Sequence, residues 1–455
     1  MATVSEILSA WLAELDVDAL SEDAARGITH TLIDTVGLAY AARRTDYVAA
    51  LANGWERGTG AATAFGLGVP GMDAASAAML NGTAAHGEDF DNTYEGCPVH
   101  SGAVVVPAVL ALAECRGISG ARTFAGMAAG IEVMCRMGQV AGKGVHSAGF
   151  HPTAVIGAIG AAAATGVTLG LNQAALVRAL GLAGSCASGI IEYLADGSWT
   201  KRMHAGWAAQ AGIRAASMAE AGFVGPVSVF EGEHGFYNAF AHSIEPDFEL
   251  LTNELGSRWE AGRLSFKPYA CGTMCQPYVD CAVRMAGTGI VPADIDSITC
   301  KVSEGTVHRL WEPLTIKHRP PSAYGAKFSA PYCIAVGLID GDAGLAQFND
   351  SRVTDDGVLD LARRINFEVD PDNEYPINYS GHILARLKDG RMVEENQSCL
   401  RGGTRDPLSD GDIVRKFQAN LLYGGMDEDR IEGLLAYCRE LRALPDLGGL
   451  AAYRN

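Results

Sequence analysis

The stretch TAVIGAIGAAAATGVTLGL, residues 153–171, decides how this chain folds, because it is long and apolar enough to be either a membrane span or a core helix. It is built from alanine and glycine rather than from leucine and isoleucine. Alanine and glycine contribute little transfer energy in a bilayer, whereas they let neighbouring helices approach closely. The stretch therefore predicts a buried, closely packed helix, and we expect no membrane association.

The same small residues dominate residues 102–190, and apolar side chains recur at helical spacing from about residue 20 to residue 245. Ser21 is a suitable N-cap for the first long helix, ahead of Ile28, Leu32 and Val36. These patterns predict an all-α domain with a dense core.

The periodicity changes near residue 290. Apolar residues alternate at 298–302 and 365–369, and an Asp389-Gly390 turn separates two short strand-like runs in 383–393. Two helical patterns follow, one after Ser409 and one after the pair Gly424-Gly425.

The fold expected from these patterns is mainly α. A chain of 455 residues exceeds the size of one hydrophobic core, so two domains are expected. We predict an all-α helical domain over residues 1–267, completed by residues 396–455, with a smaller α+β lid domain inserted over residues 268–395.

Composition narrows the possible partners. The net charge of −18 disfavours nucleic acid and anionic membranes, so a small anionic substrate would require a local cluster of cationic groups. The N-terminus is acidic where a signal peptide would be basic, and the eleven cysteines are scattered. We therefore expect a cytoplasmic protein with reduced thiols.

Three apparent cofactor signals are weak. GLGVPG, residues 66–71, fits a dinucleotide-binding pattern but lacks a second parallel strand. The run Asp89-x-Asp91-x-Thr93 begins like a calcium loop and then departs from it. Residues 271–281 hold three cysteines without iron–sulfur or zinc spacing. We expect no metal and no other cofactor.

Chemistry-bearing residues concentrate in four short segments, the first of which is HGEDFDNTYEGCPVHSG, residues 86–102. Each segment alone also has an ordinary interpretation, as a solvated acidic loop, a structural histidine or an exposed basic patch. Together they supply the hydrogen-bonding and cationic groups that the acidic chain otherwise lacks. The candidates are Asp89, Thr93, Tyr94 and His100 in the first segment, His151 in GFHPT, Lys201, Arg202 and His204 in DGSWTKRMHAGW, and Lys267 and Gln276 in SFKPYACGTMCQPYVDCA.

In these segments the chain resembles the MmgE/PrpD family, which includes 2-methylcitrate dehydratases, cis-aconitate decarboxylases and iminodisuccinate epimerases. The resemblance implies a helical domain with an α+β lid, a homodimer and no metal. It is carried, in family order, by HGEDFDNT, VHSGAVVVPAVLALAE, GFHPTAVIGAIGAAAA, DGSWTKRMHAGWAAQAGIRAASMAEAGFVGPVSVFEG, KPYACGTMCQPYVD, AKFSAPYCIAVGLIDG and DPLSDGDIVRKF.

The resemblance also assigns functional positions. In the D-F-D motif it implies functional roles for the aspartate, for the threonine that follows and for the histidine that closes the motif. In later motifs it implies functional roles for one histidine and two lysines. Relatives often have histidine at position 94, cysteine or histidine at 272 and histidine at 276, where this chain has Tyr94, Gly272 and Gln276. The implied functional residues are Asp89, Thr93, His100, His151, Lys201 and Lys267.

The reaction expected first is dehydration of a small di- or tricarboxylate such as 2-methylcitrate, by a cofactor-independent lyase. We assign Lys201 and Lys267 to carboxylate binding, His100 and His151 to proton transfer, and Asp89 to orienting a histidine or acting as base. Thr93, Tyr94, Arg202, His204 and Gln276 would bind substrate. Epimerisation, decarboxylation and a catalytically silent carboxylate-binding homologue remain alternatives.

Overall fold

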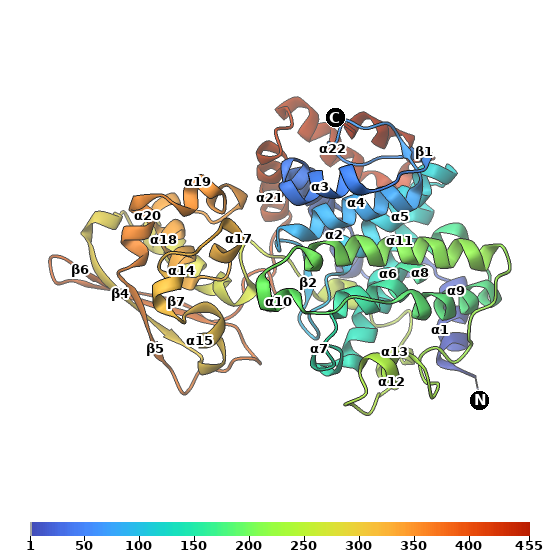
Figure 1. Ribbon diagram of the computed structural model, residues 1–455, viewed down its shortest axis with the longest axis horizontal. Coiled ribbons are helices and arrows are strands. Elements are labelled where there is room, and N and C mark those ends of the chain that lie inside the picture. Colours follow the sequence, from blue (N-terminus) through green and yellow to red (C-terminus); the bar gives the residue numbers. More distant parts are fainter. Residues whose placement is uncertain (1) are drawn as a thin grey trace. The chain divides into compact units, whose positions relative to one another are not determined.

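The structure is a computed structural model that describes residues 2–455 (Figure 1). Its residues group into two compact units. The larger unit comprises the chain up to Gly87, Asp91–Leu264 and Ile413–Asn455. The smaller unit comprises Glu88–Phe90 and Ser265–Asp412.

The larger unit is helical apart from short strands. Its elements are α1 (Val4–Ala13), η1 (Val17–Ala19), α2 (Glu22–Ala41), η2 (Ala42–Arg44), α3 (Asp46–Gly54), β1 (Thr59–Ala62), α4 (Ala74–Gly87), β2 (Thr93–Tyr94), α5 (Ser101–Arg116), α6 (Gly120–Ala141), α7 (Gly144–Ser147), α8 (Pro152–Leu169), α9 (Gln173–Cys186), α10 (Tyr193–Asp196), α11 (Thr200–Glu220), α12 (Phe236–Phe240), α13 (Glu249–Thr252), η3 (Glu260–Arg263), α22 (Glu428–Arg439), η7 (Leu441–Ala443) and η8 (Gly448–Tyr453). Two further elements, β3 (Leu264–Ser265) and α21 (Asp410–Tyr423), cross the boundary between the units.

The core of the larger unit is built around α8, which packs against α6 and α11, while α11 also packs against α4. Small residues make this possible: a Cβ atom at Gly212 of α11 would lie 2.3 Å from the Cβ of Ala161 in α8. In the described part of the chain α8 is the single helix long and apolar enough to cross a membrane, and 89% of its apolar window is buried inside the fold. It is therefore a core helix, as its composition predicts.

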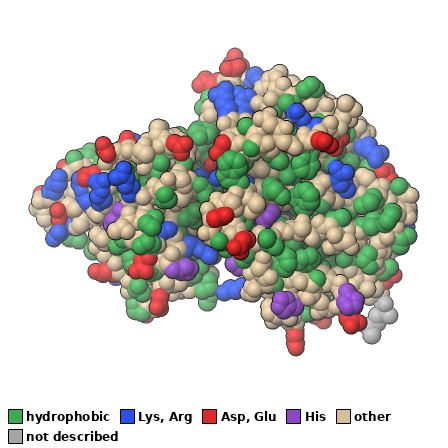
Figure 2. All heavy atoms as spheres, viewed as in Figure 1, with side chains coloured by type: hydrophobic (Ala, Val, Ile, Leu, Met, Phe, Trp, Pro, Cys, Tyr) green, Lys and Arg blue, Asp and Glu red, His purple; other side chains and the backbone are tan. Residues whose placement is uncertain are grey.

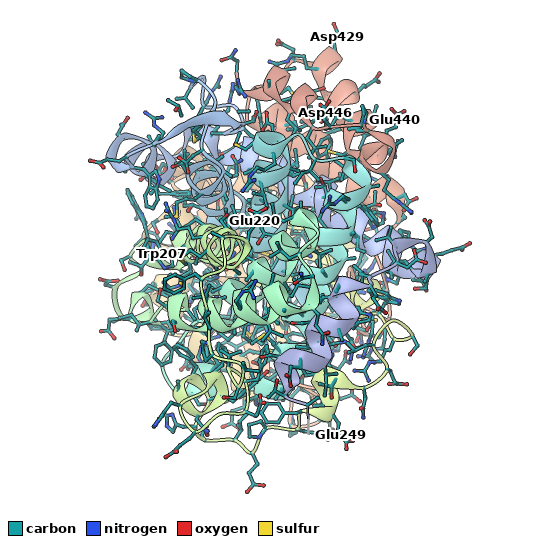
Figure 3. All side chains as sticks on the ribbon, turned by 90° about the vertical axis from the view of Figure 1, so that its right-hand side faces the viewer. Trp207, Glu220, Glu249, Asp429, Glu440 and Asp446 are labelled. Atoms are coloured by element: carbon teal, nitrogen blue, oxygen red, sulfur yellow. The ribbon has the colours of Figure 1, made fainter. Side chains whose placement is uncertain are left out.

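Local signals also behave as predicted. The hydroxyl of Ser21 caps α2 by accepting a hydrogen bond from the Ala24 amide at 3.2 Å. The C-terminal segment joins the larger unit through α21, where Lys416 Nζ lies 2.7 Å from Asp34 Oδ1 of α2. Exposed acidic side chains on this unit agree with the negative net charge. Figure 3 marks five of them, Glu220, Glu249, Asp429, Glu440 and Asp446.

The smaller unit contains a four-stranded sheet of order β5-β4-β6-β7. Strand β4 (Ile295–Val302) runs parallel to β5 (Ile365–Val369) and antiparallel to β6 (Gly381–Leu387), and β6 pairs antiparallel with β7 (Met392–Gln397). The β6–β7 turn is the predicted Asp389-Gly390 pair, where Gly390 has a φ of 89° that favours glycine. Val369, the last residue of the edge strand β5, is exposed rather than buried.

Helices cover this sheet, and α14 packs against β6 and β7. The helical elements are η4 (Thr273–Cys275), α14 (Gln276–Gly287), η5 (Pro292–Asp294), α15 (Glu304–Leu310), α16 (Leu314–Lys317), α17 (Ala323–Ala326), α18 (Ala330–Asp340), η6 (Leu345–Gln347), α19 (Asp350–Val353) and α20 (Asp356–Ala362).

The observed boundaries differ from those predicted at residues 267 and 395. Residues 396–412 belong to the smaller unit, where the Phe266 amide donates to the Gly402 carbonyl at 2.9 Å and Arg401 pairs with Asp280 at 3.4 Å. Residues 88–90 also group with this unit, although the chain on both sides belongs to the larger one.

Candidate active site

The stretch 86–102 is not a solvated acidic loop, because most of its polar side chains are buried. Asp91 and Asn92 are fully enclosed, and His86, Thr93 and His100 are at most 8% exposed. Burying so many polar groups is costly unless they pair with one another. The interpretation of this stretch as a functional site is therefore favoured over a surface loop.

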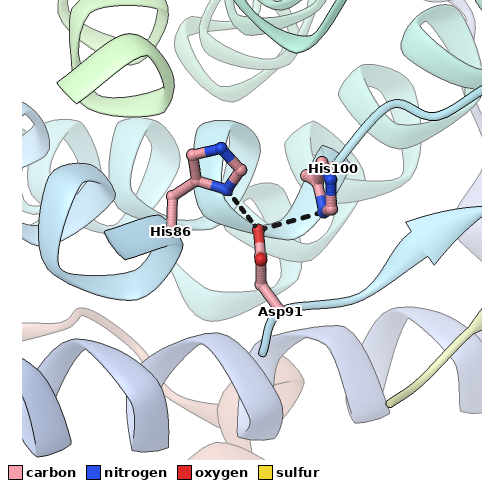
Figure 4. Close-up of side chains that lie close together, drawn as sticks. All are labelled: His86, Asp91 and His100. Carbon is pink, nitrogen blue, oxygen red and sulfur yellow. Dashed lines mark hydrogen bonds and ion pairs between the residues drawn. The ribbon is translucent and has the colours of Figure 1, made fainter. Parts of the chain in front are cut away.

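Asp91 holds two imidazoles through a single carboxylate oxygen (Figure 4). Its Oδ2 lies 2.8 Å from His86 Nδ1 and 3.4 Å from His100 Nδ1. His86 is in the last turn of α4, and His100 occupies the N-cap position of α5. The His100 Nδ1 also lies 2.9 Å from the Asn92 carbonyl oxygen, which can only accept a hydrogen bond.

Two further histidines extend this cluster within the larger unit. The ring of His151, at the N-cap of α8, stacks on that of His86 with centroids 5.6 Å apart. His151 Nδ1 lies 3.2 Å from His204 Nδ1 in α11. Lys201 is three residues before His204, and therefore on the same face of α11.

Burial controls the charge of the two outer histidines. It lowers the pKa of His151 well below its usual value, and the neighbouring His86, Lys201 and His204 lower it further. The pKa of His204 falls to about 4, chiefly through burial and also through the charges of His86 and Lys201. Both imidazoles are therefore neutral near pH 7, and can act as hydrogen-bond donors or acceptors.

Asp89 and Lys267 form a separate pair inside the smaller unit. The Lys267 ammonium donates to the Asp89 carbonyl at 2.7 Å and to its carboxylate at 3.0 Å. Asp89 has a φ of 54°, a left-handed conformation that is uncommon for a residue with a side chain. Asp91 thus holds two histidines, a role that the sequence did not assign to it. That Asp89 orients a histidine or acts as a base stays a prediction.

Other predicted substrate-binding residues have structural partners. The Tyr94 hydroxyl donates to Glu260 at 2.6 Å and accepts from Gln139 at 2.9 Å. Arg202 lies over the Tyr47 ring, 4.3 Å from its centroid. For these side chains substrate binding stays a prediction.

Gln276, the replacement for a frequent family histidine, is fully buried and its amide bonds the backbone. It accepts from the Tyr269 amide at 3.1 Å and donates to the carbonyls of Tyr269 and Cys271 at 2.9 and 2.8 Å. The amide therefore holds a loop, and the predicted role of Gln276 in binding substrate stays a prediction. At Gly272 a Cβ atom would lie 3.1 Å from the Phe328 ring, so this position is tightly packed.

Sequence reasoning assigned no role to His86 or Asp91. Their five-residue separation across the end of a helix could have suggested a pair, since His86 closes α4 and Asp91 is the second acid of the D-F-D motif. Within residues 2–455, His86, Asp91 and His100 form the only group of three possible metal ligands, with donor atoms within 4.8 Å of one another. The expectation that no metal is required stays a prediction.

The chain belongs to the MmgE/PrpD family, as the resemblance in its motifs implied. Residues 6–249 match the MmgE/PrpD N-terminal domain, and residues 269–438 match the MmgE/PrpD C-terminal domain. The two matches cover most of the chain and fall on the helical and sheet-containing parts of the fold. The mainly helical fold with a smaller sheet-containing domain is likewise confirmed.

Three of its curated relatives are named cis-aconitate decarboxylase or cis-aconitate decarboxylase-like protein. It is 30% identical to the cis-aconitate decarboxylase of Homo sapiens, over 81% of this chain and 77% of that protein. It is 26% identical to the cis-aconitate decarboxylase of Aspergillus terreus, over 98% and 94%. It is 27% identical to the cis-aconitate decarboxylase-like protein oryM of Aspergillus oryzae, over 83% and 81%. The chain is thus an enzyme of this family, with a function of the lyase or decarboxylase type.

Proposed function

We propose that this enzyme is a cofactor-independent lyase that removes a carboxyl group, as carbon dioxide, from a small unsaturated tricarboxylate of the cis-aconitate type. The names of its relatives support decarboxylation over the 2-methylcitrate dehydration expected first. The observation that carries the proposal is the buried cluster in which one Asp91 oxygen holds His86 and His100, next to His151 and His204.

This cluster suits the chemistry of decarboxylation. When the bond to the carboxyl carbon breaks, its electron pair stays on the neighbouring carbon and conjugates with a remaining carboxylate. Lys201 supplies a cation for a substrate carboxylate, and neutral His151 and His204 supply hydrogen bonds without adding charge. An imidazole held by Asp91 supplies the proton that replaces the lost group.

Dehydration of 2-methylcitrate is the second candidate, and epimerisation of iminodisuccinate the third. Both reactions need one group that removes a proton from carbon and another that returns a proton, to a leaving hydroxyl or to the same carbon. Two imidazoles on one carboxylate oxygen favour these reactions too, because one can be protonated while the other is neutral.

An NMR assay with four substrates tests these candidates. The purified enzyme is incubated in EDTA with cis-aconitate, citrate, 2-methylcitrate and iminodisuccinate, separately. We expect carbon dioxide release from cis-aconitate with a new product. Olefinic signals from 2-methylcitrate would instead support dehydration, and deuterium exchange without net conversion would support epimerisation. Binding shifts with no turnover of any substrate would overturn the proposal in favour of a silent homologue.

A further inference from the structure

His86 is the most enclosed imidazole of the cluster. Its side chain is fully buried, as is that of Asp91, whereas the side chain of His100 is 9% exposed. A histidine enclosed in this way is most often a structural residue with both ring nitrogens bonded. The contacts of its two nitrogens therefore decide between a structural and a chemical role.

The two nitrogens of His86 are in different situations. Nδ1 lies 2.8 Å from the Asp91 carboxylate, which accepts hydrogen bonds, so Nδ1 carries the proton of the neutral ring. Nε2 is then a bare acceptor, and within residues 2–455 it has no hydrogen-bond partner. A buried acceptor without a partner destabilises the fold. A purely structural histidine would not be expected to bear this cost.

In His100 the same ring nitrogen, Nδ1, carries the proton. The Asn92 carbonyl, 2.9 Å from His100 Nδ1, fixes a proton on that nitrogen as well. Both rings therefore direct N–H groups toward Asp91 and its surroundings, and His86 keeps Nε2 as the site for one further proton. A single extra proton on either ring makes the trio neutral, which lowers the cost of burying the carboxylate.

We propose that His86 is a further proton-transfer residue of this site, and that its ring, when protonated, holds on Nε2 the proton that replaces the departing carboxyl group. The inference rests on the proposed decarboxylation. In the step, the bond from carbon to the carboxyl group breaks and carbon dioxide leaves. The proton moves from Nε2 to the carbon that keeps the electron pair, and the N–H electrons remain on Nε2. Water then returns a proton to the ring, and Asp91 stabilises the imidazolium.

Two substitutions separate this role from a structural one. In His86→Asn the side-chain amide can occupy the place of Nδ1 and donate to Asp91, but nothing replaces Nε2. In His86→Gln the amide reaches the place of Nε2 and the Asp91 hydrogen bond is lost. The control is His318→Gln in the smaller unit, which retains a donor toward the Ile365 carbonyl, 2.8 Å from His318 Nε2.

We expect His86→Asn to lower kcat by about 10²-fold or more while KM and the melting temperature stay near wild type. The control should retain wild-type kinetics. Wild-type kcat in His86→Asn would overturn the inference and leave the decarboxylase proposal intact. If wild type releases no carbon dioxide from cis-aconitate, the proposed function itself has failed.

A second measurement covers variants that fail to fold. ¹⁵N-histidine labelling of the substrate-free wild type reports which nitrogen of His86 carries the proton. The His86 signals are assigned through its ring contacts with His100 and His151, and urea-unfolded wild type serves as reference. We expect a proton on Nδ1. A ring protonated on Nε2 alone, with Nδ1 bare, would overturn the inference, because Nε2 would then be occupied by the resting tautomer.

Discussion

At the scale of single residues, His204 shows how burial controls a charge in this site. Its pKa of about 4 lies below the ordinary histidine value, because burial and the charges of His86 and Lys201 penalise the imidazolium. Between pH 6.5 and 4 the unfolded chain therefore binds a proton that the folded chain excludes. The free energy of unfolding must fall as the pH falls through this window.

We expect the His204→Gln variant to lose stability less steeply than wild type between pH 7.5 and pH 5. The difference should be about 2 kcal/mol, since one proton corresponds to about 1.4 kcal/mol per pH unit. Urea unfolding at the two pH values measures it. Glu132, whose pKa is raised to about 7 by burial, acts in the opposite direction but equally in both proteins.

The control for this experiment is Met203→Gln, which introduces the same side chain one residue earlier in α11 without removing a titratable group. It should show the wild-type dependence on pH. Equal slopes for His204→Gln and wild type would mean that His204 is protonated in the folded chain as easily as in the unfolded chain.

Residue identity alone could not separate the roles of Asp89 and Asp91. Both acids belong to one short motif, and only the fold assigns Asp89 to Lys267 and Asp91 to the histidines. The hydrogen-bond partners of Tyr94 and Gln276 could not be predicted from the sequence either. Glu260 is 166 residues from Tyr94, and Gln276 forms its hydrogen bonds with backbone atoms.

At the scale of elements, much of the fold was readable from the sequence. Small residues predicted the core helix α8, Ser21 predicted the start of α2, and the Asp389-Gly390 pair predicted the β6–β7 turn. These signals are local, so periodicity and turn chemistry carry them. The placement of Glu88–Phe90 in the smaller unit was not readable, because two lysines 178 and 239 residues further along the chain fix it.

These lysines hold consecutive residues in the same way. Lys327 donates to the Glu88 carbonyl at 2.7 Å and to its carboxylate at 2.9 Å, just as Lys267 does to Asp89. The Lys327 side chain is 1% exposed, and its ammonium pairs with the Glu88 carboxylate. Asp89, held by Lys267, has the left-handed φ of 54°.

We expect Lys327→Met to destabilise the protein by about 3 kcal/mol or more, because the substitution removes one partner of a buried ion pair. Glu88→Gln should destabilise the protein less, because the side-chain amide oxygen and the backbone carbonyl of residue 88 can still accept hydrogen bonds from the Lys327 ammonium. Urea unfolding of both single variants and of the double variant measures the coupling between the two positions. Additive effects in the double variant would mean that the pair contributes no specific stabilisation.

At the scale of the whole molecule, we expect the protein to associate through the larger unit. Hydrophobic side chains gather over its face that carries α9 and α11 (Figure 2). Ile190 and Leu194, which follow α9, are exposed, and so are Phe223 and Val224, which follow α11. Exposed large apolar residues are typical of an interface. The family resemblance implies a homodimer, and we propose that a second copy of the chain covers these residues.

Light scattering at micromolar concentration should therefore give twice the chain mass for wild type. The variant Leu194→Lys with Phe223→Lys should give the mass of one chain, because four lysines would be buried in a symmetric dimer. The control Ile377→Lys changes an equally apolar, exposed residue of the smaller unit and should leave the dimer intact.

Since each copy carries a net charge of −18, added salt should screen repulsion between the copies and strengthen the wild-type dimer. A wild-type mass of one chain at both low and moderate salt would contradict the prediction, and dissociation by salt would mean that ion pairs rather than this apolar face hold the copies together.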